Sequence, residues 1–318
     1  MNKMKLVFFG SSHYSVPSLE ALVKAGYPVA AVVTLPQRKG GRGQEALSNP
    51  VLEWAEAHQI RLFQQEKMAD VSFQEALKAL SPDLFIVVSF GKFLPATLLQ
   101  IPRLYALNIH PSLLPKFRGP SPVAWALLEG EKKAGVSLFR ISERIDTGEI
   151  LLIEEAPIGE EDDVQTLSEK LFQKGADLLL KGLSLIESQK ASFTPQEEKE
   201  ATYAPRLKKA DGDIDWSQES WRIACQVRAF KGWPGSYTFY EGRRLILWKV
   251  RPHEGLSHKR PGEILDCHKQ GIFVSTGKGI LIIEELQMEG KERMAAASFL
   301  VGHPLTVGET FTCNPSQS

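Results

Sequence analysis

The 318-residue chain has few cysteines: Cys225, Cys267 and Cys313 stand far apart, and no Cys-x-x-Cys pair occurs. This argues against a zinc site built from cysteine, and no other cluster with metal-ligand spacing is visible, so we expect no metal. An odd, sparse set of cysteines also favours a reducing compartment over a disulfide framework. No run of 18 apolar residues occurs, and the apolar run in the first ten residues is too short for a signal peptide. We therefore expect a soluble, cytoplasmic protein that does not enter a membrane.

The sequence also lacks an excess of charge, because 38 basic side chains balance 38 acidic ones. No overall field indicates a nucleic-acid partner, although a local basic surface is compatible with this balance. Neither G-x-G-x-x-G nor G-x-x-x-x-G-K-[ST] occurs. The segment FFGSSHYSVPSL (residues 8–19) could hold an anion at a helix start, but a tight turn between a strand and a helix is the simpler interpretation.

The first two hundred residues alternate between strand and helix patterns. Apolar runs such as KLVFFG (5–10) and PVAAVVT (28–34) are followed by amphipathic segments. This alternation predicts an α/β domain with a Rossmann-like, mainly parallel sheet covered by helices on both faces. Two later runs, 135–142 and 148–158, predict an antiparallel hairpin, and residues 164–187 predict a long amphipathic helix.

The pattern changes near residue 190. Residues 188–216 are polar and charged with little periodicity, which is typical of a linker. A helix pattern follows, and then short strands introduced by glycine turns, which predict a small β-barrel of the OB-like kind, closed or partly closed. We therefore expect a first domain at 1–191, a linker at 192–212 and a barrel domain at 213–318.

One stretch, LNIHPSLLPKFRGPSP (107–122), combines polar side chains with stiff, proline-rich backbone. Asn108 and His110 stand two residues apart at a predicted strand end, so their side chains face the same side. An amide can donate a hydrogen bond to a developing oxyanion, and an imidazole can move a proton near neutral pH. Asp146, in the turn RIDTGEIL, could orient the imidazole. Singly, each residue is more simply a core histidine, a capping asparagine or a turn aspartate; together they favour a catalytic site.

Two motifs, NIHPSLLPKFRG (108–119) and GVSLFRISERIDTGEILL (135–152), resemble the formyltransferases that use 10-formyltetrahydrofolate. The resemblance implies that Asn108, His110 and Asp146 are catalytic and that the formyl donor is a co-substrate. It also implies a folate-contacting loop, which comprises Ser112, Leu113, Leu114 and Pro115. The end of the preceding strand would add a second wall of the folate pocket, for which core packing is an equally good interpretation: Phe90, Gly91 and Leu94.

The second half, with TYAPRLKKADGDIDW (202–216) and VRAFKGWPGSYTFYEGRRLILWKV (227–250), resembles the formyltransferases that act on methionyl-tRNA. Residues 34–51, TLPQRKGGRGQEALSNPV, resemble the loop with which that family grips the tRNA acceptor end. The resemblance implies formyl transfer from 10-formyltetrahydrofolate to the α-amino group of methionine on initiator tRNA, for the initiation of translation. A monomer is expected. The implied tRNA contacts are basic residues: Arg38, Lys39, Arg42, Lys208, Lys209 and Arg243.

Two other interpretations stay open. A formyltransferase for a nucleotide-linked amino sugar, or a 10-formyltetrahydrofolate hydrolase domain, would use the same catalytic set. The basic, glycine-rich segment at 38–43 argues against both, because a small substrate needs no such loop. A nucleic-acid-binding module without catalysis would not need Asn108, His110 and Asp146 together.

Overall fold

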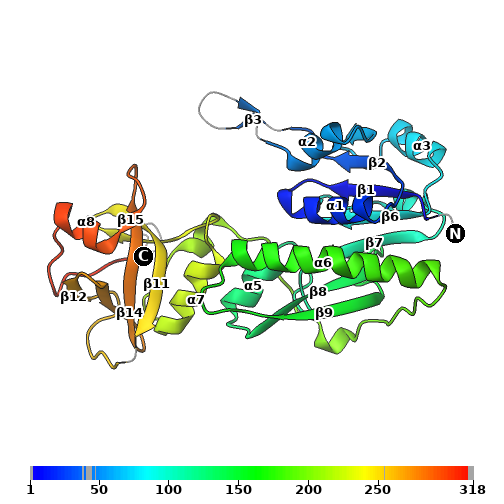
Figure 1. Cartoon of the computed structure of the whole chain (residues 1–318). Coiled ribbons are helices and arrows are strands. Elements are labelled where there is room, and N and C mark those ends of the chain that lie inside the picture. Colours follow the sequence, from blue (N-terminus) through cyan, green and yellow to red (C-terminus); the bar gives the residue numbers. More distant parts are fainter. Residues whose placement is uncertain (1–2, 38, 41–44, 47, 254, 314–318) are drawn as a thin grey trace. The chain divides into compact units, whose positions relative to one another are not determined.

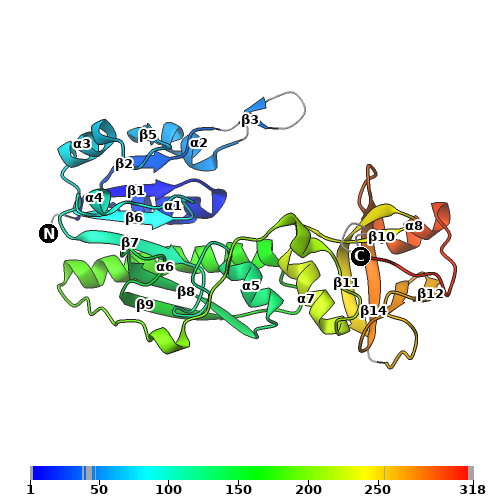
Figure 2. The ribbon, with the colours of Figure 1, turned by 180° about the vertical axis from the view of Figure 1, so that it is seen from behind.

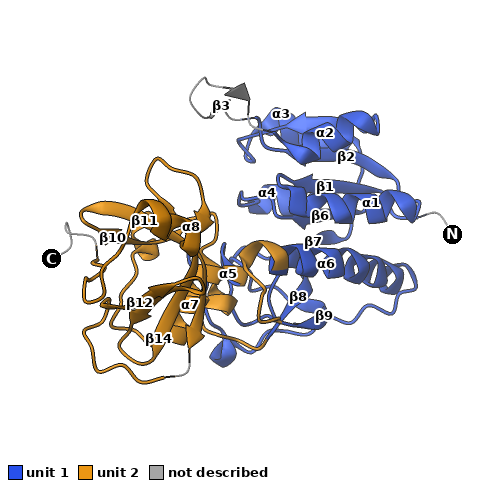
Figure 3. Ribbon diagram, turned by 60° about the vertical axis from the view of Figure 1, so that its left-hand side comes forward, with its two compact units in different colours: residues 1–122, 133–157, 167–205 blue, residues 123–132, 158–166, 206–318 orange. Residues whose placement is uncertain are grey.

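The computed structural model describes residues 3–37, 39–40, 45–46, 48–253 and 255–313 (Figure 1). The chain divides into two compact units, each of them discontinuous in sequence (Figure 3). Unit 1 comprises 1–122, 133–157 and 167–205, and unit 2 comprises 123–132, 158–166 and 206–318. The predicted domain limits at 191 and 213 stay a prediction. Among the described residues, no helix is both long enough and apolar enough to cross a membrane.

A seven-stranded sheet forms the centre of unit 1, in the order β5-β2-β1-β6-β7-β8-β9 (Figure 1, Figure 2). Its first five strands are parallel to one another. Strand β8 pairs antiparallel with β7, and β9 pairs antiparallel with β8. The predicted mainly parallel sheet and the late hairpin are therefore confirmed. The strands are β1 (Leu6–Gly10), β2 (Val29–Thr34), β5 (Leu62–Gln64), β6 (Leu84–Val88), β7 (Tyr105–His110), β8 (Lys133–Arg140) and β9 (Ile150–Pro157). Two further short strands, β3 (Lys39–Gly40) and β4 (Glu45–Ala46), pair with each other.

Helices cover both faces of this sheet. On β7, Leu107 and Ile109 join the core beneath α1, α2 and α6, whereas Ala106 belongs to the core beneath α3 and α4. Side chains alternate along a strand, so Asn108 and His110 share the face of Ala106. The helical elements of unit 1 are η1 (His13–Ser15), α1 (Val16–Lys24), α2 (Pro50–Ala57), α3 (Val71–Ala79), α4 (Ala96–Leu99), most of α6 (Val164–Glu187) and η2 (Glu198–Glu200).

The long helix predicted over 164–187 is confirmed as α6, which lies along the sheet beside β7 and β8 (Figure 1). Two of its glycines permit the close approach. A Cβ atom on Gly175 would lie 2.6 Å from Ile109 Cγ2, and one on Gly182 would lie 2.3 Å from Leu138 Cδ2. Because α6 packs so tightly on the opposite face, β7, which carries Asn108 and His110, has little freedom to shift.

Unit 2 is built on an antiparallel sheet in the order β10-β11-β14-β13-β12, with β15 added to β14. The predicted hairpin is confirmed as β10 and β11. The pairings of the described strands run from β10 to β12 without closing into a ring. The antiparallel sheet is therefore confirmed, and the OB-like barrel stays a prediction. The elements of unit 2 are α5 (Pro122–Leu128), η3 (Lys209–Gly212), α7 (Ser220–Ala229), β10 (Ser236–Tyr240), β11 (Arg243–His253), β12 (Ile264–His268), β13 (Gly271–Ser275), β14 (Ile280–Met288), β15 (Met294–Ala295) and α8 (Ala296–Gly302).

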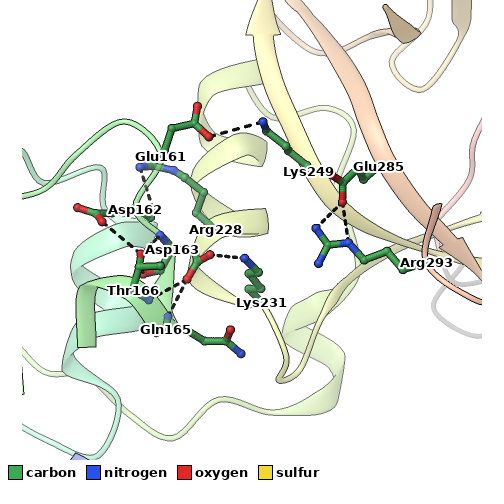
Figure 4. Close-up of polar contacts among 10 residues, drawn as sticks. All are labelled: Glu161, Asp162, Asp163, Gln165, Thr166, Arg228, Lys231, Lys249, Glu285 and Arg293. Atoms are coloured by element: carbon green, nitrogen blue, oxygen red, sulfur yellow. Dashed lines mark hydrogen bonds and ion pairs between the residues drawn. The ribbon is translucent and has the colours of Figure 1, made fainter. Parts of the chain in front are cut away.

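Within unit 2, basic side chains hold the segment that leads into α6 (Figure 4). Arg228 of α7 donates hydrogen bonds to the carbonyl oxygens of Gly159, Glu160 and Asp162. The Asp163 carboxylate caps α6, accepts from its first backbone N–H groups and pairs with Lys231. Burial raises the pKa of Asp163, but the hydrogen bonds from Lys231 and from the backbone outweigh burial and hold this pKa below its ordinary value.

Candidate active site

The end of β7 carries a nearly buried histidine with a defined hydrogen bond. His110 is 5% exposed, and its Nε2 lies 3.0 Å from the carbonyl oxygen of Phe117. A carbonyl oxygen can only accept, so Nε2 carries the ring hydrogen of the neutral imidazole. The other ring nitrogen, Nδ1, is then the free base. The loop that follows β7 thus fixes the tautomer of His110.

The predicted third catalytic residue, Asp146, approaches His110 Nδ1 from a separate turn. Asp146 lies between β8 and β9, and its Oδ2 is 3.7 Å from His110 Nδ1. This separation exceeds hydrogen-bond length but lies within ion-pair reach if the imidazole is protonated. The same Oδ2 accepts a hydrogen bond of 2.8 Å from the backbone N–H of Gly119. Asp146 can therefore stabilise a charged His110 without touching its neutral form.

Asn108 carries an amide side chain near the same strand end. Asn108 is half-buried and pairs in register with Val87 of β6 and Phe139 of β8. No hydrogen bond of the Asn108 side chain is recorded among the described residues. A half-buried donor on the same strand face as His110 can therefore bind a substrate oxygen.

The loop predicted to contact folate is fixed by a buried serine of β8. Ser137 Oγ donates to the carbonyl oxygen of Ser112 at 2.7 Å and accepts from the Leu114 N–H at 3.1 Å. The Ser112 hydroxyl donates within the loop, to the Lys116 carbonyl oxygen at 2.6 Å. Ser112 and Leu114 are buried, whereas Leu113 and Pro115 are partly exposed. Leu113 and Pro115 are thus the members of the set that offer side-chain surface to a ligand.

The second predicted wall, after β6, combines core and open positions. Phe90 and Leu94 belong to the hydrophobic core on the α3 and α4 face. Gly91 has a φ of +72°, and a Cβ atom there would meet no neighbour within 4 Å. Only Gly91 of these three offers open space, and core packing explains the other two side chains.

The turn at residues 8–19 is structural in this fold. Ser11 Oγ donates to the carbonyl oxygens of Ser89 and Phe90, and Ser15 Oγ donates to that of Val88. The hydroxyl groups of Ser11 and Ser15 therefore tie the first turn to the end of β6 and are not free for an anion. The simpler interpretation of this segment agrees with these contacts.

Sequence reasoning missed the contribution of residues 194–204. Gln196 of this segment bonds to the turn of Asp146, and Thr202 and Ala204 pair with the backbone of Arg118. Gly119 next to it has a φ of +124°, and a Cβ atom there would lie 2.6 Å from the Ala204 carbonyl oxygen. Polar composition without periodicity gave no signal for these contacts, because the pairing uses the backbone and one amide side chain.

The predicted tRNA contacts fall in three places. Arg38 and Arg42 lie outside the described residues, and Lys39 is on β3. Lys208, Lys209 and Arg243 of unit 2 are exposed and form no ion pair among the described residues.

Lys209 and Arg244 both lie against Tyr237 of β10. Lys209 offers its carbonyl oxygen to the Tyr237 hydroxyl at 3.5 Å, and the Arg244 guanidinium lies 3.9 Å from the centre of the Tyr237 ring. Arg243 precedes Arg244 on β11, so the two side chains face opposite sides of the strand. Tyr237 is 4% exposed, so its ring packs inside unit 2, and the exposed positive charge of the predicted contacts lies on Lys208, Lys209 and Arg243.

Comparison with known proteins gives matches over nearly the whole chain. Residues 4–183 match the family described as Formyl transferase, and residues 206–304 match Formyl transferase, C-terminal domain. A protein named methionyl-tRNA formyltransferase from Syntrophus aciditrophicus (strain SB) is 42% identical, over 97% of this chain and 99% of its own length. One of the same name from Alkaliphilus oremlandii (strain OhILAs) is 39% identical, over 96% and 98%.

Solved structures show the same fold at lower identity. HypX from Aquifex aeolicus in complex with tetrahydrofolic acid has a TM-score of 0.65 and 18% identity, over 98% of this chain and 51% of that one. The N-formyltransferase from Helicobacter canadensis, in complex with folinic acid and dTDP-3-aminofucose, has a TM-score of 0.65 and 20% identity, over 88% and 98%. At these identities the likeness concerns the fold alone.

Proposed function

Because the chain belongs to the family of methionyl-tRNA formyltransferases, we propose that it transfers a formyl group to the α-amino group of methionine carried by initiator tRNA. The formyl donor in this proposal is 10-formyltetrahydrofolate. The observation that carries it is the approach of Asp146 to His110 at the end of β7, with Asn108 on the same strand face, in a chain that matches the family along both halves.

His110 acts as the base in this reaction. The α-amino group must lose a proton when it attacks the formyl carbon, and Nδ1 is the ring nitrogen with a free lone pair. The hydrogen bond from Nε2 to the Phe117 carbonyl oxygen keeps that lone pair on Nδ1. The same ring can then return the proton to the departing folate nitrogen.

Asp146 stabilises the positive charge that His110 gains. Its carboxylate is held by the Gly119 N–H at 2.8 Å and lies 3.7 Å from Nδ1, within ion-pair reach of a charged ring. A fixed carboxylate beside an imidazole favours the protonated ring, as in other acyl-transfer sites.

Asn108 stabilises the opposite charge. As the amine attacks, negative charge develops on the formyl oxygen, and an amide donor aimed at that oxygen lowers the barrier by about 3–4 kcal/mol. The Asn108 amide suits this role because no hydrogen bond within the described residues occupies it. Its position on a central strand, backed by α6, limits its movement.

The residues around this end of the sheet fit a folate. Open space at Gly91 and the partly exposed Leu113 and Pro115 give apolar surface on two loops beside the catalytic face. A planar, partly apolar co-substrate binds such surfaces, with backbone groups for its polar edge. Phe90 and Leu94, which follow β6, pack behind this surface in the core.

The tRNA docks through positive charge. Arg38, Lys39 and Arg42 of the glycine-rich segment, together with the exposed Lys208, Lys209 and Arg243 of unit 2, carry this part of the proposal. The antiparallel sheet of unit 2, completed as an OB-like barrel, presents its basic residues to the tRNA phosphates. Affinity for the tRNA should therefore fall steeply as the salt concentration rises, whereas folate affinity should change little.

The test supplies the purified chain with 10-formyltetrahydrofolate and initiator tRNA charged with methionine. The expected product is formylmethionyl-tRNA. Free methionine, a nucleotide-linked amino sugar and water serve as competing acceptors in parallel reactions. Formylation of the sugar or hydrolysis of the folate, with no formylation of the aminoacyl-tRNA, contradicts the proposal.

A second experiment tests the assigned roles. Asp146→Asn keeps an oxygen for the Gly119 N–H but loses the negative charge, so the fold should persist while kcat falls by roughly 10³-fold or more. Asp177→Asn on the exposed side of α6 removes an equal charge away from the site and is the matched control. Full activity of Asp146→Asn would remove this carboxylate from the mechanism.

A further inference from the structure

Residues 194–204 connect the two turns that meet at His110, and we call them the strap. At its start, Thr194 and Ile150 exchange two backbone hydrogen bonds of 2.8 and 2.9 Å at the beginning of β9. At its end, Arg118 donates its N–H to Thr202 O at 2.9 Å and accepts from Ala204 N at 2.7 Å. The strap is thus anchored both beside the turn of Asp146 and on the loop that follows His110.

Gln196 lies between these anchors and bonds to both turns. Its Nε2 donates to the carbonyl oxygens of Asp146 at 2.9 Å and Gly148 at 2.7 Å. Its Oε1 accepts from Arg118 Nε at 3.0 Å. One side chain therefore satisfies two carbonyl groups of the Asp146 turn and one nitrogen of the His110 loop.

Arg118 makes the orientation of this amide unambiguous. A guanidinium only donates, so the atom of Gln196 that faces it is the oxygen, and the amide nitrogen must face the Asp146 turn. Arg118 is 2% exposed and also donates from Nη1 to Glu198 on the strap, at 2.9 Å. A buried charge that is hydrogen-bonded on two sides holds its partners firmly, because releasing it would leave the charge without compensation.

The Asp146 turn needs such support. Asp146 has a φ of +53°, in the left-handed region that non-glycine residues adopt only at a cost. Its carboxylate is held by the Gly119 N–H, and its own carbonyl oxygen is held by Gln196. The first restraint comes from the loop that carries Arg118 and Gly119, and the second comes from the strap, through a side chain that is itself bonded to Arg118. The position of Asp146 relative to His110 therefore depends on the bond between Gln196 and Arg118.

We propose that Gln196 is a positioning residue, which sets the place of the Asp146 carboxylate opposite His110 without touching a substrate. This inference rests on the proposed function, because it concerns the same reaction. It also assigns the strap, whose composition is that of a linker, to the catalytic apparatus of unit 1.

Two variants separate positioning from general support of the fold. Gln196→Glu keeps an oxygen for Arg118 and so keeps the strap anchored, but it removes both donors to the Asp146 turn. Gln196→Met removes all three hydrogen bonds at nearly the same volume. The control is Lys199→Met on the same strap, whose side chain is 77% exposed and points to no residue of the two turns.

In both Gln196 variants kcat should fall about 10- to 100-fold, the loss expected for a displaced catalytic group. The KM values for 10-formyltetrahydrofolate and for methionyl-tRNA should stay unchanged, whereas the urea unfolding midpoint should fall in both variants, because two carbonyl oxygens of the Asp146 turn lose their donors. Lys199→Met should equal the parent chain in all four measurements. Unchanged kcat in Gln196→Glu and Gln196→Met, or a fall in kcat matched by a rise in both KM values, overturns the inference.

The parent chain and Asp146→Asn are assayed first. If the parent chain does not formylate methionyl-tRNA, the proposed function fails. If the parent chain is active, Asp146→Asn is inactive and the Gln196 variants retain full kcat, only the positioning role of Gln196 fails.

Discussion

Removal of the Ser137 hydroxyl should weaken unit 1 and the folate loop together. Ser137 is fully buried on β8, and its hydroxyl bridges the carbonyl oxygen of Ser112 and the N–H of Leu114. In Ser137→Ala both backbone groups lose their partner while they remain inside the protein. Each buried, unsatisfied polar group costs about 1–3 kcal/mol, so the pair costs about 2–6 kcal/mol of unfolding free energy.

We expect the lower half of that range, because the loop can move outward and regain contact with water. The same movement displaces Leu113 and Pro115, so the KM for 10-formyltetrahydrofolate should rise. The KM for methionyl-tRNA should not change, because no basic residue of the predicted tRNA surfaces depends on this loop.

The assay is urea unfolding of the full chain, with hydrogen exchange of the β7 and β8 amides to assign the transition to unit 1. Ser18→Ala is the matched control. Ser18 is equally buried, but its hydroxyl has no hydrogen-bond partner among the described residues. Its removal should therefore be neutral or slightly stabilising. Equal midpoints for Ser137→Ala and Ser18→Ala, with unchanged folate KM, would refute the bridging role of Ser137.

Two further predictions concern helix α6. The pKa of Asp163 is lowered, so its stabilising effect is fully present above the unfolded pKa of about 3.9 and is lost as the pH falls through the lower folded pKa. Asp163→Asn should lower the urea midpoint at neutral pH, and its deficit should shrink as the pH falls below about 4; an equal deficit at every pH would contradict the ion pair with Lys231. Gly182→Ala should lower the thermal unfolding midpoint, because overpacking against Leu138 costs about 1–3 kcal/mol while alanine restores only about 1 kcal/mol of helix propensity. A raised midpoint would show that the helix can move away from the sheet.

Local patterns predicted the elements of this fold well. The periodicity of residues 164–187 gave the helix at its observed limits, because a long apolar stripe of period 3.6 has no competing interpretation. The spacing of Asn108 and His110 predicted a shared strand face for the same reason: alternation follows directly from strand geometry. The pairing of Asp146 with His110 was predicted from the need for a group that orients the imidazole, with the family resemblance in support, because no local rule joins residues on separate loops.

The strap is a part of the structure that such sequence patterns could not predict. Its side chains are mostly exposed and polar, so its composition is that of a linker, yet its backbone pairs with Ile150 and Arg118. Backbone pairing of an irregular segment leaves no periodic trace, because every residue type offers the same N–H and C=O groups. The core positions of Phe90 and Leu94 were undecided for a related reason. An apolar residue after a strand can face a ligand or the core, and only the packing of α3 and α4 decides between them.

Two groups act on the two ring nitrogens of His110: a backbone carbonyl oxygen on Nε2 and the Asp146 carboxylate near Nδ1. A carboxylate at hydrogen-bond distance would by itself fix the tautomer of a histidine, but Asp146 stands at 3.7 Å and the Phe117 carbonyl oxygen stands at 3.0 Å from the other nitrogen. The tautomer is therefore set by a main-chain group, whose position depends on the stiff, proline-rich loop and on the hydrogen bond from the Phe117 N–H to Thr202 Oγ1 of the strap, at 2.9 Å. In the proposed mechanism, Asp146 then has one role, which is to stabilise the charged form of His110. The prolines around one histidine thus place a carbonyl group, which is a role that no side-chain motif records.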